Sequence, residues 1–442
     1  MKKVHLLLVV LLSLSAAAPL PLSGQDTLRL SLDEALNRGL SHNLALRSQQ
    51  LRIRQSELEA ARLNARRAPV VEAGSDLRSN LILPTTIIPG NVFSSPGQAG
   101  EDLRVRFGTV FTLNAAIDAR YPLLDPRLSN DRKIAALQRD IESSTLESQQ
   151  QQVRLQIAEA WYEVCIQEQQ RRLADEKATR ARELLAITQT LASAGTALPA
   201  DLLRSELDLS NALSAVELAQ TQWESSRQTL AYLIGLPAGQ AFWVVGAQTP
   251  DVPATPIQQT ELHRPELLTL SQRVELAELQ RAQTAQGYKP SVDLYGSTAL
   301  QHLSNNLSVW QNWFPLTYVG LQAKVVLFDG HLRRQNEEIA QVQWEIARRN
   351  LEQQSEAIAY ELTTADQAIR QATLQWSNAQ ANLRASKQLF TLERTRYAEG
   401  KLRYAELINA EYTLREAERN VLNAWYNYLL AKARRDKAGG WQ

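Results

Sequence analysis

The longest regular pattern in the chain is a seven-residue repeat of apolar positions between Ile358 and Phe390. Large and small residues alternate along it: Leu362, Ile369, Trp376, Leu383 and Phe390 are large, and Ala365, Ala372, Ala379 and Ser386 are small. A strict seven-residue repeat keeps its seam against a partner only when the helix supercoils. No proline interrupts residues 332–396, so the pattern predicts one helix of about 100 Å at 1.5 Å per residue.

The other helical patterns repeat this arrangement. Helical periodicity predicts a second long helix from Leu128 to Leu191, a turn near Gly195 and Pro199, and a return helix from Asp201 to Ile234. The long helix that starts at Leu332 is likewise followed by a return helix, and a shorter amphipathic helix precedes each pair. These other helices are expected over residues 403–435, 31–67 and 261–287.

Matching residues in the two halves indicate an internal duplication. The matching residues occur in the same order in both halves. In the first helix of each half, and just after it, His42, Leu46 and Pro69 match His263, Leu267 and Pro290. Further along, Asp125 matches Asp329, and Gly195, Glu206 and Leu209 match Gly400, Glu411 and Leu414. The predicted organisation is a signal peptide at 1–24, a first repeat at 25–234, a linker or equatorial segment at 235–256, a second repeat at 257–436 and a tail at 437–442.

Each repeat also contains two segments in which apolar and polar residues alternate. In one of them Leu113, Ala115 and Ile117 face one side, and Asn114, Asp118 and Arg120 face the other. A soluble sandwich would pack its apolar face on a second sheet, but the chain has no other strands to form one, which leaves lipid as the apolar partner. The four strands are expected at about 69–79, 107–124, 290–301 and 317–328.

Four strands cannot close a barrel, and open backbone edges in lipid are costly, so we expect the chain to oligomerise. Two copies would give eight strands with a filled interior, and three would give twelve strands with room for a lumen, so a trimer is favoured. The aromatic residues Trp310, Trp313, Phe314 and Tyr318 suit a membrane–water boundary, or else form a local cluster.

Composition excludes several functions. The chain of 442 residues has a formal net charge of +1, which offers no attraction for nucleic acid. The single cysteine, Cys165, cannot form an intrachain disulfide, and the five histidines lack metal-ligand spacing. No catalytic motif is present, so neither an enzyme, a cofactor nor a metal site is expected.

The N-terminus has the features of a secretory signal. Lys2 and Lys3 precede an apolar run from Leu6 to Leu14, and small residues follow it. A buried N-terminal strand or helix is the alternative. After the signal, no apolar run is long enough for a membrane-spanning helix, so we expect any membrane-embedded part to consist of strands.

Several ordered motifs make the chain similar to TolC-type outer-membrane efflux proteins over nearly all of its mature length. They are the sequence Leu327–Gly330 that ends the last strand, the tip sequence Tyr397–Gly400, and the following Glu406, Leu407, Ala410 and Glu411. The resemblance implies a mainly α-helical fold with a transmembrane β-barrel. A trimer would form a twelve-stranded barrel in the outer membrane of a Gram-negative bacterium, continued by a twelve-helix periplasmic α-barrel.

The resemblance also implies a function. Such a protein is the exit duct of a tripartite efflux or type I secretion system, working with a periplasmic adaptor (membrane fusion) protein and an inner-membrane pump. The cargo could be a drug, a metal ion or a protein. A secreted coiled-coil scaffold, or an adaptor without a pore, is the alternative.

The same resemblance assigns candidate site residues. Glu406 and Asn409 match the periplasmic gate, with an amide in place of the family's second carboxylate, and a plain solvated carboxylate is the alternative for Glu406. Tyr397 and Asp201 match a tip-closing hydrogen bond, while Leu402 stands where the family has an arginine. The tips expected to contact the adaptor, unless they are ordinary solvated turns, are Gly195, Thr196, Pro199, Gly400, Lys401 and Leu402.

Overall fold

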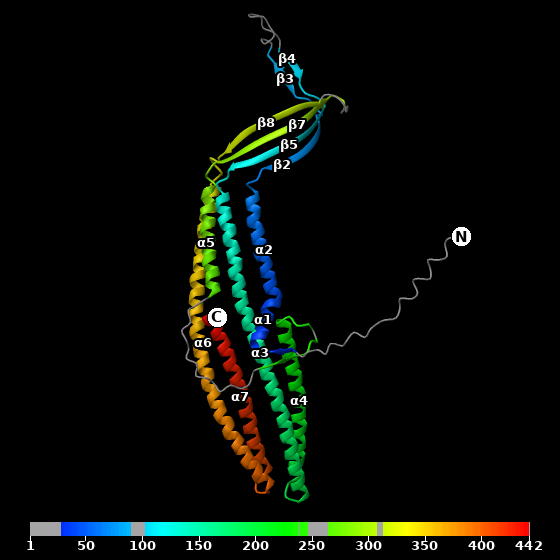
Figure 1. The fold of residues 1–442 in the computed structure, drawn as a ribbon, viewed down its shortest axis with the longest axis vertical. Coiled ribbons are helices and arrows are strands. Elements are labelled where there is room, and N and C mark those ends of the chain that lie inside the picture. The colour runs from blue at the N-terminus through cyan, green and yellow to red at the C-terminus, as the bar shows by residue number, and fades with distance from the viewer. Residues whose placement is uncertain (1–27, 90–101, 238, 246–263, 307–312, 442) are drawn as a thin grey trace, which may run out of the picture. The chain divides into compact units, whose positions relative to one another are not determined.

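The structure, a computed structural model, divides into two compact units that share three long helices. The hairpin unit comprises residues 1–43, 153–257 and 368–434, and the sheet unit comprises residues 44–152, 258–367 and 435–442. Figure 1 shows their helices and strands. The described residues are 28–89, 102–237, 239–245, 264–306 and 313–441. The predicted signal, part of the linker and Trp310 lie outside them.

A four-stranded antiparallel sheet dominates one end of the sheet unit (Figure 1). Its strands are β2 (Val70–Ser79), β5 (Phe111–Leu124), β7 (Ser291–Ser304) and β8 (Trp313–Lys324), in the order β2-β5-β7-β8. The central pair β5–β7 therefore joins the two sequence repeats, and β2 and β8 lie at the edges.

The strand register confirms the predicted alternation. Val71, Ala119 and Gly296 align across three strands on the apolar face, and their sequence neighbours point to the other side. That opposite, polar face carries Glu72, Asp76, Asn114, Asp118, Arg120, Asp293, Gln301, Gln322 and Lys324. One face of the sheet is thus suited to lipid and the other to water.

The strand ends differ from the predicted ones. β5 begins at Phe111 and not at 107, because Gly108 has φ of 117° and breaks the extended backbone. β8 spans 313–324 and not 317–328, because Trp313 already pairs with His302 of β7. Within the loop between β2 and β5, β3 (Thr85–Ile88) pairs with β4 (Leu103–Arg106), an element that the sequence analysis did not predict.

Four helical segments form a layer in the same order as the strands. α2 (Leu44–Ala65) contacts α3 (Leu128–Ser193), which contacts α5 (Pro265–Gln286), which contacts α6 (Leu332–Ala398). Three hydrogen bonds mark these contacts: Gln49 to Glu142, Ser144 to Gln272 and Arg281 to Gln341, at 2.6, 2.9 and 2.7 Å. α2 and the first part of α6 are therefore the edge helices of the layer.

The prediction of a single helix over residues 31–67 is wrong, because the helix is interrupted at Asn43. α1 (Leu32–His42) begins with a capping box in which the Ser31 backbone donates to Glu34 at 2.8 Å. It ends at Asn43, whose extended backbone (φ −64°, ψ 123°) stops the helix before α2 begins.

The two long helices confirm the predicted rods. α3 has 66 residues and α6 has 67, against predicted ends at 191 and 396. The seam of α6 is buried at every small position and at Trp376 and Phe390, while Leu362, Ile369 and Leu383 are half-buried. The return helices are α4 (Pro199–Leu233) and α7 (Tyr404–Gly439).

A small parallel pair of strands completes the hairpin unit. β1 (Leu28–Leu30) pairs with β6 (Phe242–Val244), which lies in the predicted linker. The Trp161 indole of α3 donates to the Leu30 carbonyl at 3.5 Å, so the pair packs on this helix. Among the described residues, no helix combines the length and apolar character needed to cross a membrane.

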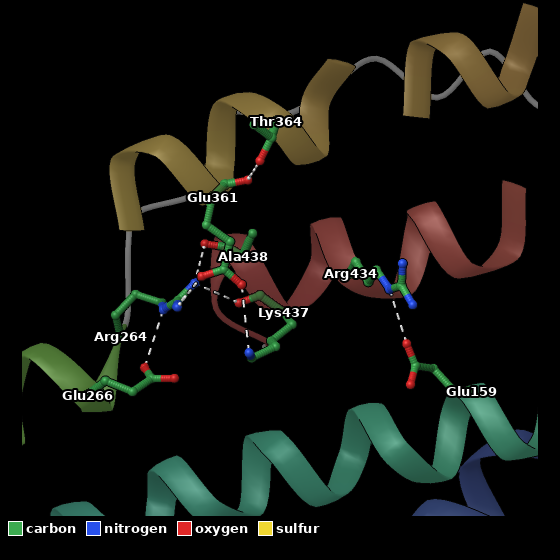
Figure 2. Close-up of polar contacts among 8 residues, drawn as sticks. All are labelled: Glu159, Arg264, Glu266, Glu361, Thr364, Arg434, Lys437 and Ala438. Carbon is green, nitrogen blue, oxygen red and sulfur yellow. Dashed lines mark hydrogen bonds and ion pairs between the residues drawn. The ribbon is translucent and has the colours of Figure 1, made fainter. Parts of the chain in front are cut away.

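The end of α7 is held by Arg264, whose side chain is 2% exposed (Figure 2). Its guanidinium donates to the carbonyl of Ala438 at 3.0 Å and to the carboxylate of Glu361 at 2.8 Å. The predicted tail at 437–442 is therefore partly helical and buried, with Ala438 fully inaccessible. Arginine caps the last carbonyls of a helix well because it supplies several donors from one planar group.

Replacing Arg264 by methionine should destabilise the protein by about 2–4 kcal/mol, because the Ala438 carbonyl and Glu361 lose a buried partner. The matched control is Arg434→Met, since Arg434 is 61% exposed and, within the described residues, its ion pair is with Glu159 (Figure 2). It should cost about 1 kcal/mol or less. Urea unfolding followed by the helical circular dichroism signal measures both, and equal losses would show that Arg264 holds nothing essential.

Candidate functional site

The two helical hairpins of the hairpin unit end in turns of the same geometry. After α3 the Thr196 amide donates to Leu191 and the Gly195 amide donates to Ala192, at 2.9 and 3.0 Å. After α6 the Lys401 and Gly400 amides bond Arg396 and Tyr397 in the same way, both at 2.9 Å. Gly195 and Gly400 have φ of 74° and 72°, which glycine adopts without strain.

The residues of the turns lie where the sequence analysis expected them, with one exception. Five of the six predicted contact residues are exposed, and Leu402 is half-buried against the apolar cluster below the turn. Lys401 pairs with Glu399 of its own turn at 2.8 Å. The exposed five are Gly195, Thr196, Pro199, Gly400 and Lys401.

An apolar cluster joins the two hairpins next to the turns. Leu184 of α3 packs with residues of α6 and α7, which are almost completely buried. Its members on α6 and α7 are Phe390, Tyr397, Tyr404, Leu407, Ala410 and Leu414. Burial of this surface holds the α6–α7 hairpin against α3.

Tyr397 makes a buried hydrogen bond inside this cluster. Its hydroxyl lies 3.0 Å from the Thr188 hydroxyl, and both residues are at most 3% exposed. Because Thr188 donates its own proton to the Leu184 carbonyl at 2.8 Å, Tyr397 is the donor in this contact. The bond joins α6 to α3.

Tyr404 makes a second bond of this kind, from α7 to α4. Its hydroxyl donates to Asp208 at 3.2 Å, and its ring lies 5.8 Å from that of Tyr397. Burial raises the pKa of both phenols, and the charge of Asp208 raises that of Tyr404 further. Both tyrosines therefore stay protonated at neutral pH and remain donors.

The predicted hydrogen bond between Tyr397 and Asp201 is corrected by this geometry. Tyr397 bonds Thr188, and Asp201 pairs with Arg204 on its own helix at 3.4 Å. The charge of Asp201 still contributes to the raised pKa of Tyr397. The heptad spacing of Phe390, Tyr397 and Tyr404 could have identified the second tyrosine, whereas no sequence pattern singles out Thr188 or Asp208.

A group of buried charges, which the sequence analysis missed, joins α3 to α7 further from the turn. Arg180 lies 2.9 Å from Glu418 and 3.9 Å from Glu411, and Arg415 donates to Glu411 at 2.9 Å. Glu411 and Glu418 are 2% and 6% exposed. Such a network fixes the register of two helices, because a shift would leave charges buried without partners.

Burial dominates the ionisation of this charge network. Burial raises the pKa of Glu418, although the charge of Arg180 opposes this shift. Burial also lowers the pKa of Lys177, and the positive charge of Arg415 lowers it further. Because Glu418 has its higher pKa in the folded state, its contribution to stability increases as the pH falls through that value toward 4.5. The network thus fixes the register of α3 and α7 but lowers the stability of the folded protein at pH values where Glu418 is charged.

Glu406 and Asn409 lie on the exposed face of α7. The other face, with Leu407 and Ala410, is buried in the apolar cluster. Both predicted gate residues therefore present their side chains away from their own hairpin unit's core.

Comparison with known proteins finds similar proteins for this architecture. Residues 257–440 match the model of the outer membrane efflux protein family. The chain is 24% identical over 339 residues to the alkaline protease secretion protein AprF of Pseudomonas aeruginosa, a match that covers 72% of this chain and 68% of AprF.

Solved outer-membrane proteins share the fold. The outer membrane channel CmeC of Campylobacter jejuni superimposes with a TM-score of 0.73 at 16% identity, covering 92% of this chain and 85% of CmeC. The outer membrane protein VceC of Vibrio cholerae gives 0.72 at 14% identity, covering 93% of this chain and 97% of VceC. The mainly helical, duplicated fold extends over both repeats.

The family match covers the second repeat, including the turn at Gly400, and the fold match adds the first repeat. The resemblance seen in the sequence is thereby confirmed: the second repeat matches the outer membrane efflux protein family, and both repeats share the fold of solved outer-membrane proteins.

Proposed function

We propose that the protein is an outer-membrane exit duct of a tripartite efflux or type I secretion system. It would act as a passive trimeric channel in the outer membrane of a Gram-negative bacterium, gated at its periplasmic helix tips. One observation carries this proposal. The four-stranded sheet and the helical layer of the sheet unit both have edge elements that a single chain leaves without a packing or hydrogen-bonding partner in the described residues.

The sheet provides the first pair of edges. Within the described residues, β2 and β8 each pair with one neighbour, so each leaves a row of backbone donors and acceptors open. On the apolar face, Val71, Val319 and Leu321 are 64–76% exposed. A sheet with a lipid-facing side cannot leave its edges unpaired, so β2 of one copy must meet β8 of another.

The helical layer provides the second pair. α2 exposes a leucine every seven residues, and α6 exposes apolar side chains over the corresponding length. These stripes lie on the edge helices of the layer, and each suits the seam of a coiled coil. The exposed residues are Leu44, Leu51 and Leu58 on α2, and Ile339, Val342 and Ile346 on α6.

The polar face of the sheet favours three copies. It carries Glu72, Asp118 and Arg120 at adjoining positions, a surface suited to a water-filled lumen. Eight strands would leave space only for packed side chains, whereas twelve would enclose a lumen. A closed twelve-stranded barrel is therefore the assembly that satisfies both faces and both edges.

The hairpin unit supports gating at the tips. The α6–α7 hairpin rests on the first hairpin through the apolar cluster and the hydrogen bonds of Tyr397 and Tyr404, which we call the tyrosine latch. Three copies would place three Glu406 side chains around one axis. Loosening the latch would let the second hairpin move outward.

The exposed turns support a periplasmic adaptor as partner. Gly195, Thr196, Pro199, Gly400 and Lys401 form compact helix ends onto which an adaptor's helical hairpin could continue the coiled coil. Leu402 packs inward and is better placed to support its turn. An inner-membrane pump would complete the system, and the similarity to AprF, a secretion protein, supports type I secretion beside efflux.

The trimer is tested by Leu51→Ala on the exposed stripe of α2. Loss of a packed leucine should weaken each interface by about 2 kcal/mol and lower the temperature at which a trimer band dissociates on a gel. The control is Leu268→Ala, on the inner helix α5. If the wild type is monomeric in detergent, or if both variants behave alike, the edge-to-edge assembly is wrong.

The tyrosine latch is tested by Tyr397→Phe and Tyr404→Phe in planar bilayers. Each loses one hydrogen bond worth about 1 kcal/mol to the closed state, so open probability should rise about fivefold per variant. The control is Tyr412→Phe, which removes the hydroxyl of an exposed tyrosine on α7 and should leave the open probability unchanged. A reconstituted protein that conducts no ions under any condition would refute the exit-duct proposal and favour a scaffold or adaptor.

The gate is tested by Glu406→Gln. Three carboxylates around an axis attract divalent cations, so their loss should weaken divalent-cation block roughly tenfold. Asn409→Asp should strengthen the block by adding a second acidic ring. Glu416→Gln, also exposed on α7, is the control. Block that is the same in all four proteins would show that Glu406 lies away from the constriction.

A further inference from the structure

A cavity of about 360 Å³ lies in the sheet unit, where the helices adjoin the polar face of the sheet. It is bounded by the ends of α2 and α5, the residues that precede α3, and the adjoining ends of β5, β7 and β8. Its charged lining residues are Arg66, Arg127, Lys289, Lys324, Asp125 and Asp293. All of them belong to one chain and one unit.

The balance of charge in this cavity is positive after pairing. Arg66 lies 3.7 Å from Asp125 and 3.2 Å from Asp131, which offset its charge. In the described part of the chain, no carboxylate lies within 4.0 Å of the cationic nitrogens of Arg127, Lys289 or Lys324. Three cations therefore line the cavity with Asp293 as their one remaining acidic neighbour in the lining.

Backbone geometry leaves room for one of these cations. A Cβ atom at Gly287 would lie 3.2 Å from Nη2 of Arg127, so the glycine allows the guanidinium to approach the backbone. Next to it, Arg333 is held by Asp329 at 2.7 Å and stacks on the Tyr288 ring at 4.3 Å. Arg333 thus has partners, whereas among the described residues the guanidinium of Arg127 donates no hydrogen bond.

We propose that this cavity binds a phosphate group. Arginine presents a planar fork of donors that matches phosphate oxygens, and lysines add mobile positive charge. The volume exceeds that of inorganic phosphate, so a larger phosphate ester also fits. The ligand is either a soluble phosphate compound or the headgroup of an anionic phospholipid. The site is complete in one chain and depends neither on the trimer nor on transport.

The test uses purified full-length protein in a zwitterionic detergent. Pyrophosphate is titrated by calorimetry, and phosphatidylglycerol is added to the micelles and detected by native mass spectrometry. In Arg127→Gln/Lys324→Gln the affinity should fall at least about tenfold, because two charge-assisted contacts are lost. The control Arg104→Gln/Arg370→Gln removes the same charge from exposed positions elsewhere and should bind as the wild type does.

A second variant keeps the proposal testable if the double variant Arg127→Gln/Lys324→Gln does not fold. Gly287→Ala keeps every charge, and its backbone at φ −62° accepts alanine, while the added Cβ atom would lie 3.2 Å from Nη2 of Arg127 and 3.2 Å from the Thr284 carbonyl oxygen. It should weaken binding to a smaller extent. Pyrophosphate binding lost in the cavity variant supports a soluble ligand, and phosphatidylglycerol binding lost alone supports a lipid headgroup. Binding of neither probe, or an equal loss in the control, overturns the proposal.

Discussion

Hydrogen bonding at the edges of the sheet is the constraint from which the other features of the structure follow. In lipid no water is present, so the backbone N–H and C=O groups of an edge strand need partners from another strand. A sheet with one apolar face can sit in lipid only if every donor and acceptor along its edges is paired, and in the part of the chain that the structure describes the outer edges of β2 and β8 have no partner strand. The same incompleteness recurs in the helical layer, whose edge helices expose apolar stripes. In the proposed assembly one chain is therefore a segment of a closed wall, and the proposed function follows from that closure.

At the other unit, the contact between hairpins combines strong packing with few polar bonds. The apolar cluster supplies most of the adhesion, while the hydrogen bonds of Tyr397 and Tyr404 and the pairing of Arg180 with Glu418 select one register. Apolar surfaces slide past one another at little cost, but buried charges and phenols do not. A contact with this composition can have two states, one in register and one released.

Much of this was predictable because the dominant signals are periodic. The heptad of α6 and the alternation of β5 each reflect one periodic rule that applies to many residues. The tip glycines reflect a positive φ that glycine adopts without strain. The break at Asn43 was not predictable, because α1 and α2 are both helical in pattern. Nor were the partners of Tyr397 and Arg264, because a pairing such as that of Arg264 with Ala438 depends on where distant segments meet.

The matched lengths of α3 and α6, 66 and 67 residues, constrain how such a chain can evolve. Inserting one residue into either rod would rotate its seam by about 100° and move its turn by about 1.5 Å relative to the other. Heptads added to both outgoing and both returning helices would preserve the seam and keep the turns level. The length of the paired hairpins can therefore change only in coordinated steps of about 10 Å, and each such step must occur in both repeats.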